Sequence, residues 1–122
     1  MKKILSKNFT FEAAHKLLFT KNKINENIHG HSFLVEVSII DKSNNIEKNG
    51  MVMDLSLFET KLYNIKKSLD HSFLNNIKNL ENPTIENIAI WIWEQLKYEE
   101  ISLYKIVVSR KSCGESFELI ND

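Results

Sequence analysis

The chain has 122 residues, of which 43% are hydrophobic and 26% charged, and this profile predicts one soluble globular domain over residues 1–122. Its 16 basic and 16 acidic residues balance, which argues against nucleic acid or an anionic membrane surface as a partner. No apolar run approaches the roughly 18 residues that a membrane-spanning helix needs, and we expect neither a signal peptide nor, with a single cysteine, an internal disulfide.

The first predicted elements are two strands, because apolar and polar residues alternate along both. Alternate residues of 9–15 share one apolar face, which ends at His15. Residues 17–28 are polar and irregular, and we expect them to form a loop. The second strand begins at His31 and carries apolar residues at every second position from Phe33 to Ile39. Each strand therefore presents one face to a core.

The middle of the chain predicts two amphipathic helices. Turn-forming residues 41–45 and a short apolar strand at 51–53 come first. Asp54 is the expected N-cap of a helix whose apolar residues recur at spacings of three and four: Leu55, Phe58, Leu62, Ile65 and Leu69. Pro83 and Thr84 open the second helix. Its apolar side comprises Ile85, Ile88, Ala89, Ile92, Trp93 and Leu96.

The last predicted element is a hairpin, in which strands 103–109 and 116–120 flank a turn at 110–114. The order of elements is thus two strands with a short extension, two helices, and two strands. This order predicts an α+β fold with both helices on one face of an antiparallel sheet. Because exposed sheet edges are usually paired with another subunit, we also expect an oligomer.

Three of the four histidines lie at the ends of the first two predicted strands. One residue separates His29 from His31, so on an extended chain both rings share a face, with Cα atoms roughly 6 to 7 Å apart. If the strands pair antiparallel, the ring of His15 meets the other two. Three neutral imidazoles with an open fourth position are typical of a catalytic zinc site. The alternative interpretation is that these are ordinary core histidines.

The fourth histidine, His71, follows Asp70 directly after the first predicted helix. A carboxylate beside an imidazole orients the ring and raises its basicity, as a general acid or base requires. The alternative interpretation is structural, because the helix dipole stabilises a protonated histidine at a helix C-terminus.

Four motifs occur in order along the chain: Phe11-Glu12-Ala13-Ala14-His15, His29-Gly30-His31, Asp70-His71-Ser72-Phe73-Leu74-Asn75 and Pro83-Thr84-Ile85-Glu86-Asn87-Ile88-Ala89. The series resembles that of the 6-pyruvoyl-tetrahydropterin synthase family. Residues 80–84 and 91–97 are especially similar to its bacterial 6-carboxytetrahydropterin synthase branch, which acts in the queuosine and 7-deazaguanine pathway. The resemblance covers nearly the whole chain.

This resemblance implies a tunnelling fold (T-fold) assembled as a homohexamer, a dimer of trimers with sites between subunits. It implies a lyase that acts on 7,8-dihydroneopterin triphosphate, with Zn²⁺ on His15, His29 and His31. The expected lack of an internal disulfide fits a cytoplasmic location. Asp70 and His71 match the family's proton-transfer pair. As a Lewis acid, zinc would lower the pKa of the hydroxyls on the substrate's side chain.

Further substrate contacts are expected from residues beside these motifs. Lys16 follows His15 and is our candidate for contacting the triphosphate as a point charge, the alternative being a solvated surface lysine. The expected contacts to the rest of the substrate are Thr84, Glu86 and Glu115.

The chain departs from the family pattern at two positions. The bacterial branch carries a cysteine in C-x-x-x-H-G-H, where this chain has Asn25, which cannot supply a thiolate. The neighbouring Glu26 resembles the glutamate of the class III members, which release 6-hydroxymethyl-dihydropterin; the alternative is a surface acid in a polar loop. The glutamate that usually anchors the pterin aligns with Lys111, which offers only donors, so Glu86 and Glu115 are the candidates to take its place. Cys113, in the same turn, is interpreted as a small hairpin residue, the alternative being a catalytic cysteine.

Several functions are therefore compatible with the sequence. The leading hypothesis is the lyase that makes 6-carboxy-5,6,7,8-tetrahydropterin. The second is the class III reaction with Glu26 as base, which makes a folate precursor. The third is a non-catalytic paralogue that binds zinc and a pterin or purine without turnover, favoured by Asn25 and Lys111. A zinc hydrolase with three histidine ligands is a more distant alternative.

Overall fold

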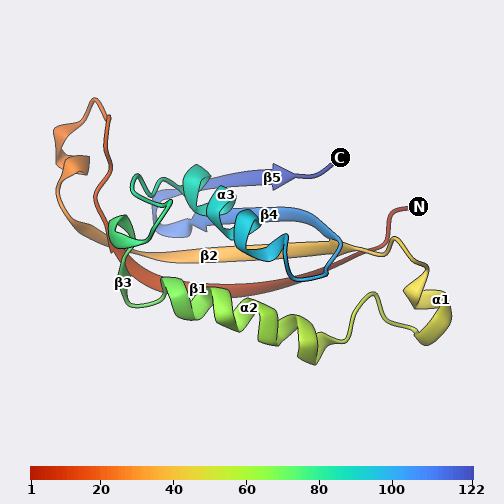
Figure 1. Cartoon of the computed structure of the whole chain (residues 1–122). Coiled ribbons are helices and arrows are strands. Elements are labelled where there is room, and N and C mark those ends of the chain that lie inside the picture. The colour runs from red at the N-terminus through yellow and green to blue at the C-terminus, as the bar shows by residue number, and fades with distance from the viewer.

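The computed structural model describes all 122 residues as a twisted five-stranded sheet covered on one face by helices (Figure 1). The strands are β1 (Ile4–His15), β2 (His29–Ile40), β3 (Ser72–Phe73), β4 (Leu103–Arg110) and β5 (Glu115–Ile120). The helices are α1 (Asn45–Asn49), α2 (Leu55–Leu69) and α3 (Ile85–Leu96), with short 3₁₀ turns at Lys23–Glu26, Leu74–Asn76 and Lys111–Cys113. The α+β class predicted from the element order is confirmed.

The sheet is built around the long antiparallel pair of β1 and β2. Their register runs without interruption from Ile4 opposite Ile40 to His15 opposite His29. β4 pairs antiparallel with β2, and β5 pairs antiparallel with β4, so the strand order is β3-β1-β2-β4-β5. The two ends of the β1–β2 pair therefore lie far apart, and the histidine end is well separated from the chain's N-terminus (Figure 1).

The core lies between the sheet and the two long helices. Alternate residues of β2, including Phe33, Val35 and Val37, are fully buried, as the period of two predicts. The buried helix residues are Phe58, Leu62, Ile65 and Leu69 of α2 together with Ile85, Ile88, Ala89, Trp91, Ile92 and Leu96 of α3. They form one continuous apolar cluster with the strands, and this cluster holds the ends of β1 and β2 in place.

Both helices begin at the predicted caps. The Asp54 side chain accepts a hydrogen bond from the Ser56 amide, and the Thr84 side chain accepts one from the Asn87 amide. These bonds satisfy amides that have no partner within the helix. The longest helix, α2, has 15 residues, and none of the helices has the length and apolarity that crossing a membrane requires.

Four details of the sequence-based prediction are wrong. The sheet is mixed, because β3 pairs parallel with β1. Residues 51–53 form no strand; they have no neighbouring strand, and Val52 and Met53 instead pack partly buried against the core. A short helix, α1, occupies 45–49, where the Asp41 carboxylate accepts from the amides of residues 45 and 46. Leu55 is 54% exposed, because it lies in the first turn of α2, beyond the edge of the core.

Candidate functional site

Three histidine rings converge at one end of the sheet. His15 is the last residue of β1 and lies opposite His29, while His31 lies opposite Ala13. All three side chains therefore emerge on the helix-covered face. The ring centroids are 4.6 Å apart for His15 and His29, 5.1 Å for His15 and His31, and 4.9 Å for His29 and His31. One nitrogen from each ring lies within 4.8 Å of the others, so the cluster can hold a metal ion.

Hydrogen bonds orient two of these rings toward a common point. Nδ1 of His15 lies 2.8 Å from the carbonyl oxygen of Pro83, and Nδ1 of His29 lies 2.8 Å from that of Asn27. A carbonyl oxygen only accepts, so each Nδ1 carries the hydrogen and each Nε2 keeps its lone pair. This arrangement is usual for histidines that bind metals.

The strongest sign that the cluster fits a metal is a buried atom without a partner. His15 is fully buried, and its Nε2 makes no hydrogen bond. An unsatisfied buried acceptor costs about 1–3 kcal/mol, a cost that coordination of an ion removes. Three neutral nitrogen ligands suit a divalent transition ion such as zinc and leave a coordination position for a substrate.

Burial also keeps the rings in their metal-binding form. Burial lowers the pKa of His15 to about 4, against the opposing hydrogen bond to Pro83. The pKa of His31 is also lowered, first by burial and then by the positive charge of Arg110. At neutral pH both rings are therefore uncharged, as metal ligands must be.

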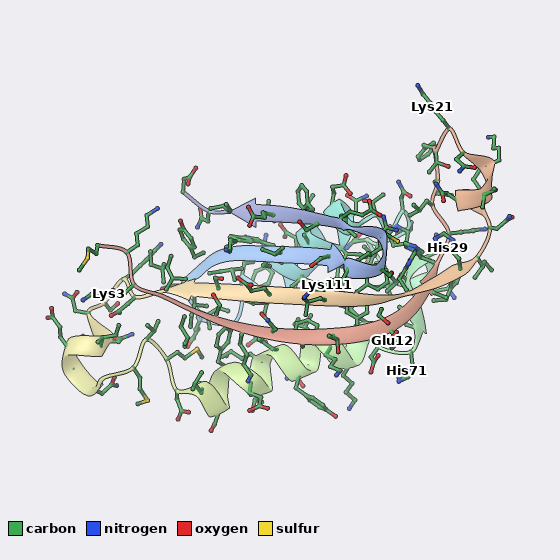
Figure 2. The ribbon with its side chains drawn as sticks, turned by 180° about the vertical axis from the view of Figure 1, so that it is seen from behind. Lys3, Glu12, Lys21, His29, His71 and Lys111 are labelled. Carbon is green, nitrogen blue, oxygen red and sulfur yellow. The ribbon has the colours of Figure 1, made fainter.

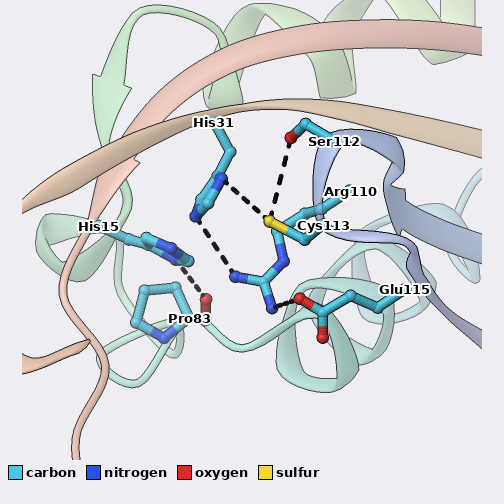
Figure 3. Close-up of polar contacts among 7 residues, drawn as sticks. All are labelled: His15, His31, Pro83, Arg110, Ser112, Cys113 and Glu115. Carbon is cyan, nitrogen blue, oxygen red and sulfur yellow. Dashed lines mark hydrogen bonds and ion pairs between the residues drawn. The ribbon is translucent and has the colours of Figure 1, made fainter. Parts of the chain in front are cut away.

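Arg110 is a site residue that the sequence analysis did not single out. Its Nη1 lies 3.4 Å from Nε2 of His31, and its Nη2 lies 2.5 Å from Oε1 of Glu115 (Figure 3). Sγ of Cys113 lies 3.9 Å from Nδ1 of His31, so the turn after β4 contacts this ring from a second side. One signal was available in the sequence, because Arg110 is the only arginine in a chain rich in lysine.

The Asp70–His71 pair lies outside the histidine cluster. Oδ2 of Asp70 is 3.5 Å from Nε2 of His71, and its Oδ1 accepts from the Glu12 amide at 2.9 Å. The His71 amide donates to the Glu12 carbonyl, which places His71 beside Glu12 (Figure 2). Since Glu12 precedes Ala13 on β1, its side chain lies on the sheet face opposite the cluster. The His71 side chain is 83% exposed, and no hydrogen bond within the chain joins it to the three rings.

Glu26 and Lys16 lie at opposite ends of the loop between β1 and β2, which projects from the end of the sheet with Lys21 at its tip (Figure 2). The Glu26 side chain is 40% exposed and forms an ion pair with Lys23 at 3.2 Å. Lys16 is exposed, and both its backbone N–H and its carbonyl bond to the side chain of Asn75. No hydrogen bond or ion pair joins either side chain to the three rings.

The remaining candidate substrate residues divide between the site and its surroundings. Glu115 reaches the cluster through its ion pair with Arg110. Thr84 follows Pro83, whose carbonyl holds His15, but its hydroxyl already accepts from the Asn87 amide. Glu86 is exposed in the first turn of α3, and its side chain forms no hydrogen bond. Lys111 is exposed in the turn next to Arg110.

The chain is similar to known proteins over most of its length. The family profile described as 6-pyruvoyl tetrahydropterin synthase matches residues 4–119. A 6-carboxy-5,6,7,8-tetrahydropterin synthase from Synechocystis sp. is 42% identical over 98 residues, covering 77% of this chain and 74% of that protein. A dihydroneopterin monophosphate aldolase from Pyrococcus furiosus is 39% identical over 88 residues, covering 72% of this chain and 69% of that protein.

Solved structures share the fold over the whole chain. The 6-pyruvoyl tetrahydropterin synthase of Caenorhabditis elegans superimposes with a TM-score of 0.79 at 22% identity, covering 100% of this chain and 97% of that one. A Plasmodium vivax 6-pyruvoyltetrahydropterin synthase, with cysteine in place of a catalytic glutamate, superimposes with a TM-score of 0.74 at 18% identity, covering 100% of this chain and 99% of that one. The predicted tunnelling fold is thereby confirmed.

Proposed function

This chain belongs to the 6-pyruvoyl tetrahydropterin synthase family, and from this premise we propose that it is a zinc-dependent lyase acting on 7,8-dihydroneopterin triphosphate. The observation that carries the proposal is the set of three converging imidazoles, one of which has a fully buried nitrogen without a partner. The product that we propose first is 6-carboxy-5,6,7,8-tetrahydropterin, within the queuosine and 7-deazaguanine pathway. The relative from Synechocystis sp. with that product in its name supports this choice.

In this proposal His15, His29 and His31 hold the metal through nitrogen lone pairs. A zinc ion bound there supplies Lewis-acid chemistry, which lowers the pKa of the hydroxyls on the substrate's side chain. The carbonyls of Pro83 and Asn27 fix the tautomers of His15 and His29, so that these rings need no rearrangement before they bind the ion.

Asp70 and His71 are the proposed proton-transfer pair. One oxygen of Asp70 accepts from the Glu12 amide, and the other lies 3.5 Å from Nε2 of His71, within ion-pair distance of the protonated imidazole. Because His71 lies on the far side of β1 from the cluster in its own chain, we propose that it serves the site of a neighbouring subunit in a homohexamer. The high exposure of His71 supports this arrangement.

A second product is favoured by a specific observation at the loop before β2. Asn25 stands where the bacterial branch has its cysteine, and Glu26 lies three residues before His29. The Plasmodium vivax protein of the same fold provides a precedent for a catalytic glutamate, and the Pyrococcus furiosus relative is an aldolase by name. We therefore propose Glu26 as a base that yields 6-hydroxymethyl-dihydropterin as the alternative outcome.

Incubation with 7,8-dihydroneopterin triphosphate followed by mass analysis separates these outcomes. Acetaldehyde with 6-carboxytetrahydropterin supports the first product, and 6-hydroxymethyl-dihydropterin supports the second. Unchanged substrate on a protein that contains zinc would contradict both and indicate a binding protein without turnover.

The variant Glu26→Gln tests the proposed base. We expect the product yield to fall at least a hundredfold with unchanged zinc content, because general-base catalysis contributes about 10²–10⁴ in rate. Lys23→Met, which removes only the ion-pair partner of Glu26, is the matched control and should retain activity. Full activity of Glu26→Gln would remove this residue from the mechanism. Loss of His29 or His31 should instead remove metal and activity together.

A further inference from the structure

We propose that Arg110 couples metal binding to anion binding at the three-histidine site. The positive charge of its guanidinium weakens the binding of a metal ion alone and strengthens the binding of a metal ion that also carries an anionic oxygen. This inference rests on the proposed function and deepens it, because it names the class of group that the metal would present to the site. The group is an anionic oxygen, of the kind that the triphosphate of the proposed substrate carries.

The first observation is the position of the charge. Nη1 of Arg110 lies 3.4 Å from Nε2 of His31, the ring nitrogen that accepts from the guanidinium. The guanidinium has five donors and no acceptor, and it does not lose its proton in proteins. A divalent ion bound to His31 therefore has a permanent positive charge as its neighbour.

The second observation is that this charge is only partly compensated. The Arg110 side chain is 12% exposed, whereas its partner Glu115 is 44% exposed, so solvent screens the carboxylate more than the guanidinium. Nε of Arg110 is buried without any hydrogen-bond partner. The side chain is thus held by one partially exposed ion pair and one contact to a neutral ring.

The third observation concerns the choice of residue. Arg110 is the only arginine of the chain, while the exposed cations are lysines. Arginine binds oxygen anions through parallel N–H donors, which lysine cannot provide in the same geometry.

Together these observations predict that the guanidinium stabilises an anion bound to the metal. The negative charge of the anion in turn offsets the repulsion between the guanidinium and the metal ion. Metal and anion then bind cooperatively, and by linkage each increases the affinity of the other by the same factor.

Cobalt(II) provides a direct test, because its absorption reports coordination independently of turnover. Co²⁺ affinity is measured by chelator competition in the full chain, with and without acetate and, separately, inorganic phosphate as probes. In the unmodified protein we expect either anion to tighten Co²⁺ binding about tenfold and to change the absorption spectrum. Arg110→Met should bind Co²⁺ alone at least as tightly and lose most of the anion effect, whereas Lys111→Met, which removes the adjacent exposed cation, should retain it.

A second variant tests the same coupling without removing the arginine. Glu115→Gln removes the compensating carboxylate, so we expect the anion to increase Co²⁺ affinity more than in the unmodified protein. Equal coupling in the unmodified protein, Arg110→Met and Glu115→Gln would overturn this inference while leaving the metal site and the pterin lyase standing. Absence of Co²⁺ binding in every variant would overturn both proposals.

Discussion

His15 combines three features that rarely occur together in an ordinary core histidine. Its ring is fully buried, its Nδ1 donates to the Pro83 carbonyl, and its Nε2 faces the other rings without a hydrogen-bond partner. A core histidine satisfies both nitrogens, because an unpaired buried group is destabilising. His15 therefore resembles a ligand more than a packing residue.

The lowered pKa of His15 makes the stability of the metal-free protein depend on pH. The pKa is about 4 in the folded protein and about 6.5 in the unfolded chain. As pH falls from about 6.5 to 4, the unfolded chain takes up a proton that the folded state excludes. The free energy of unfolding should then fall by about 3 kcal/mol through His15. Urea unfolding at pH 7.0 and pH 4.5 measures this loss.

The matched comparison for this pH dependence is His15→Gln, which lacks the titrating group. Its loss of stability over the same interval should be about 2–3 kcal/mol smaller than that of the unmodified protein. Identical pH dependence in the two proteins would show that His15 does not titrate in this way.

At the scale of elements, the loop after β1 is held by the segment between β3 and α3. Nδ2 of Asn75 donates to the carbonyls of Lys16 and Glu81, and its Oδ1 accepts from the Lys16 amide. Asn82 similarly accepts from the Leu18 amide through its side chain. These bonds fix the chain directly after His15, and Pro83, the residue after Asn82, holds the ring itself.

Replacing Asn75 with alanine should loosen this connection. Three hydrogen bonds disappear, and because their backbone groups are partly accessible to water, we expect a loss of about 1–2 kcal/mol in the free energy of unfolding. Zinc affinity should fall as well, because His15 is then less firmly positioned. Asn76→Ala is the control, as the adjacent exposed side chain makes no hydrogen bond. Equal stability and zinc affinity in the two variants would refute this role.

At the scale of the whole molecule, metal binding and folding should be linked. The three rings come from the two strands that form the centre of the sheet, so the unfolded chain does not present the site. At a zinc concentration a thousandfold above Kd, binding adds about 4 kcal/mol to stability, which corresponds to roughly 15 °C in Tm for a chain of this size. Chelator treatment should reverse the shift in a thermal scan.

The control for this shift is His29→Ala, which removes one ligand from an only partly buried position. The variant should unfold at nearly the same temperature with and without zinc. An equal zinc-induced rise in both proteins would mean that the ion binds elsewhere.

The sheet edges and the projecting loop predict that the chain associates with itself. β5 has a neighbour only on one side, and the loop carries the exposed apolar residues Phe19, Ile24 and Ile28 at 90%, 71% and 65%. Unpaired edges and apolar surface are commonly covered by another subunit. Light scattering should give a mass several times 14.3 kDa, six times for the proposed hexamer. A mass of 14.3 kDa at micromolar concentration would contradict this prediction.

The sequence by itself determined the parts of this protein that depend on local periodicity and short-range chemistry. Alternation identified β1, β2 and the final hairpin, and the spacing of apolar residues identified α2 and α3 with their caps. It also predicted that His15, His29 and His31 meet, because antiparallel pairing brings the end of one strand beside the start of the next. The order of four motifs identified the family.

Only the tertiary structure decided the features that depend on long-range contacts. The two-residue strand β3 joins the outer edge of β1, and no local signal marks so short a pairing. The Pro83 carbonyl beside His15 and the guanidinium of Arg110 beside His31 come from 68 and 79 residues away along the chain. Residue type and spacing establish that imidazoles meet, but the charge and hydrogen bonds around them depend on how distant turns pack against the sheet.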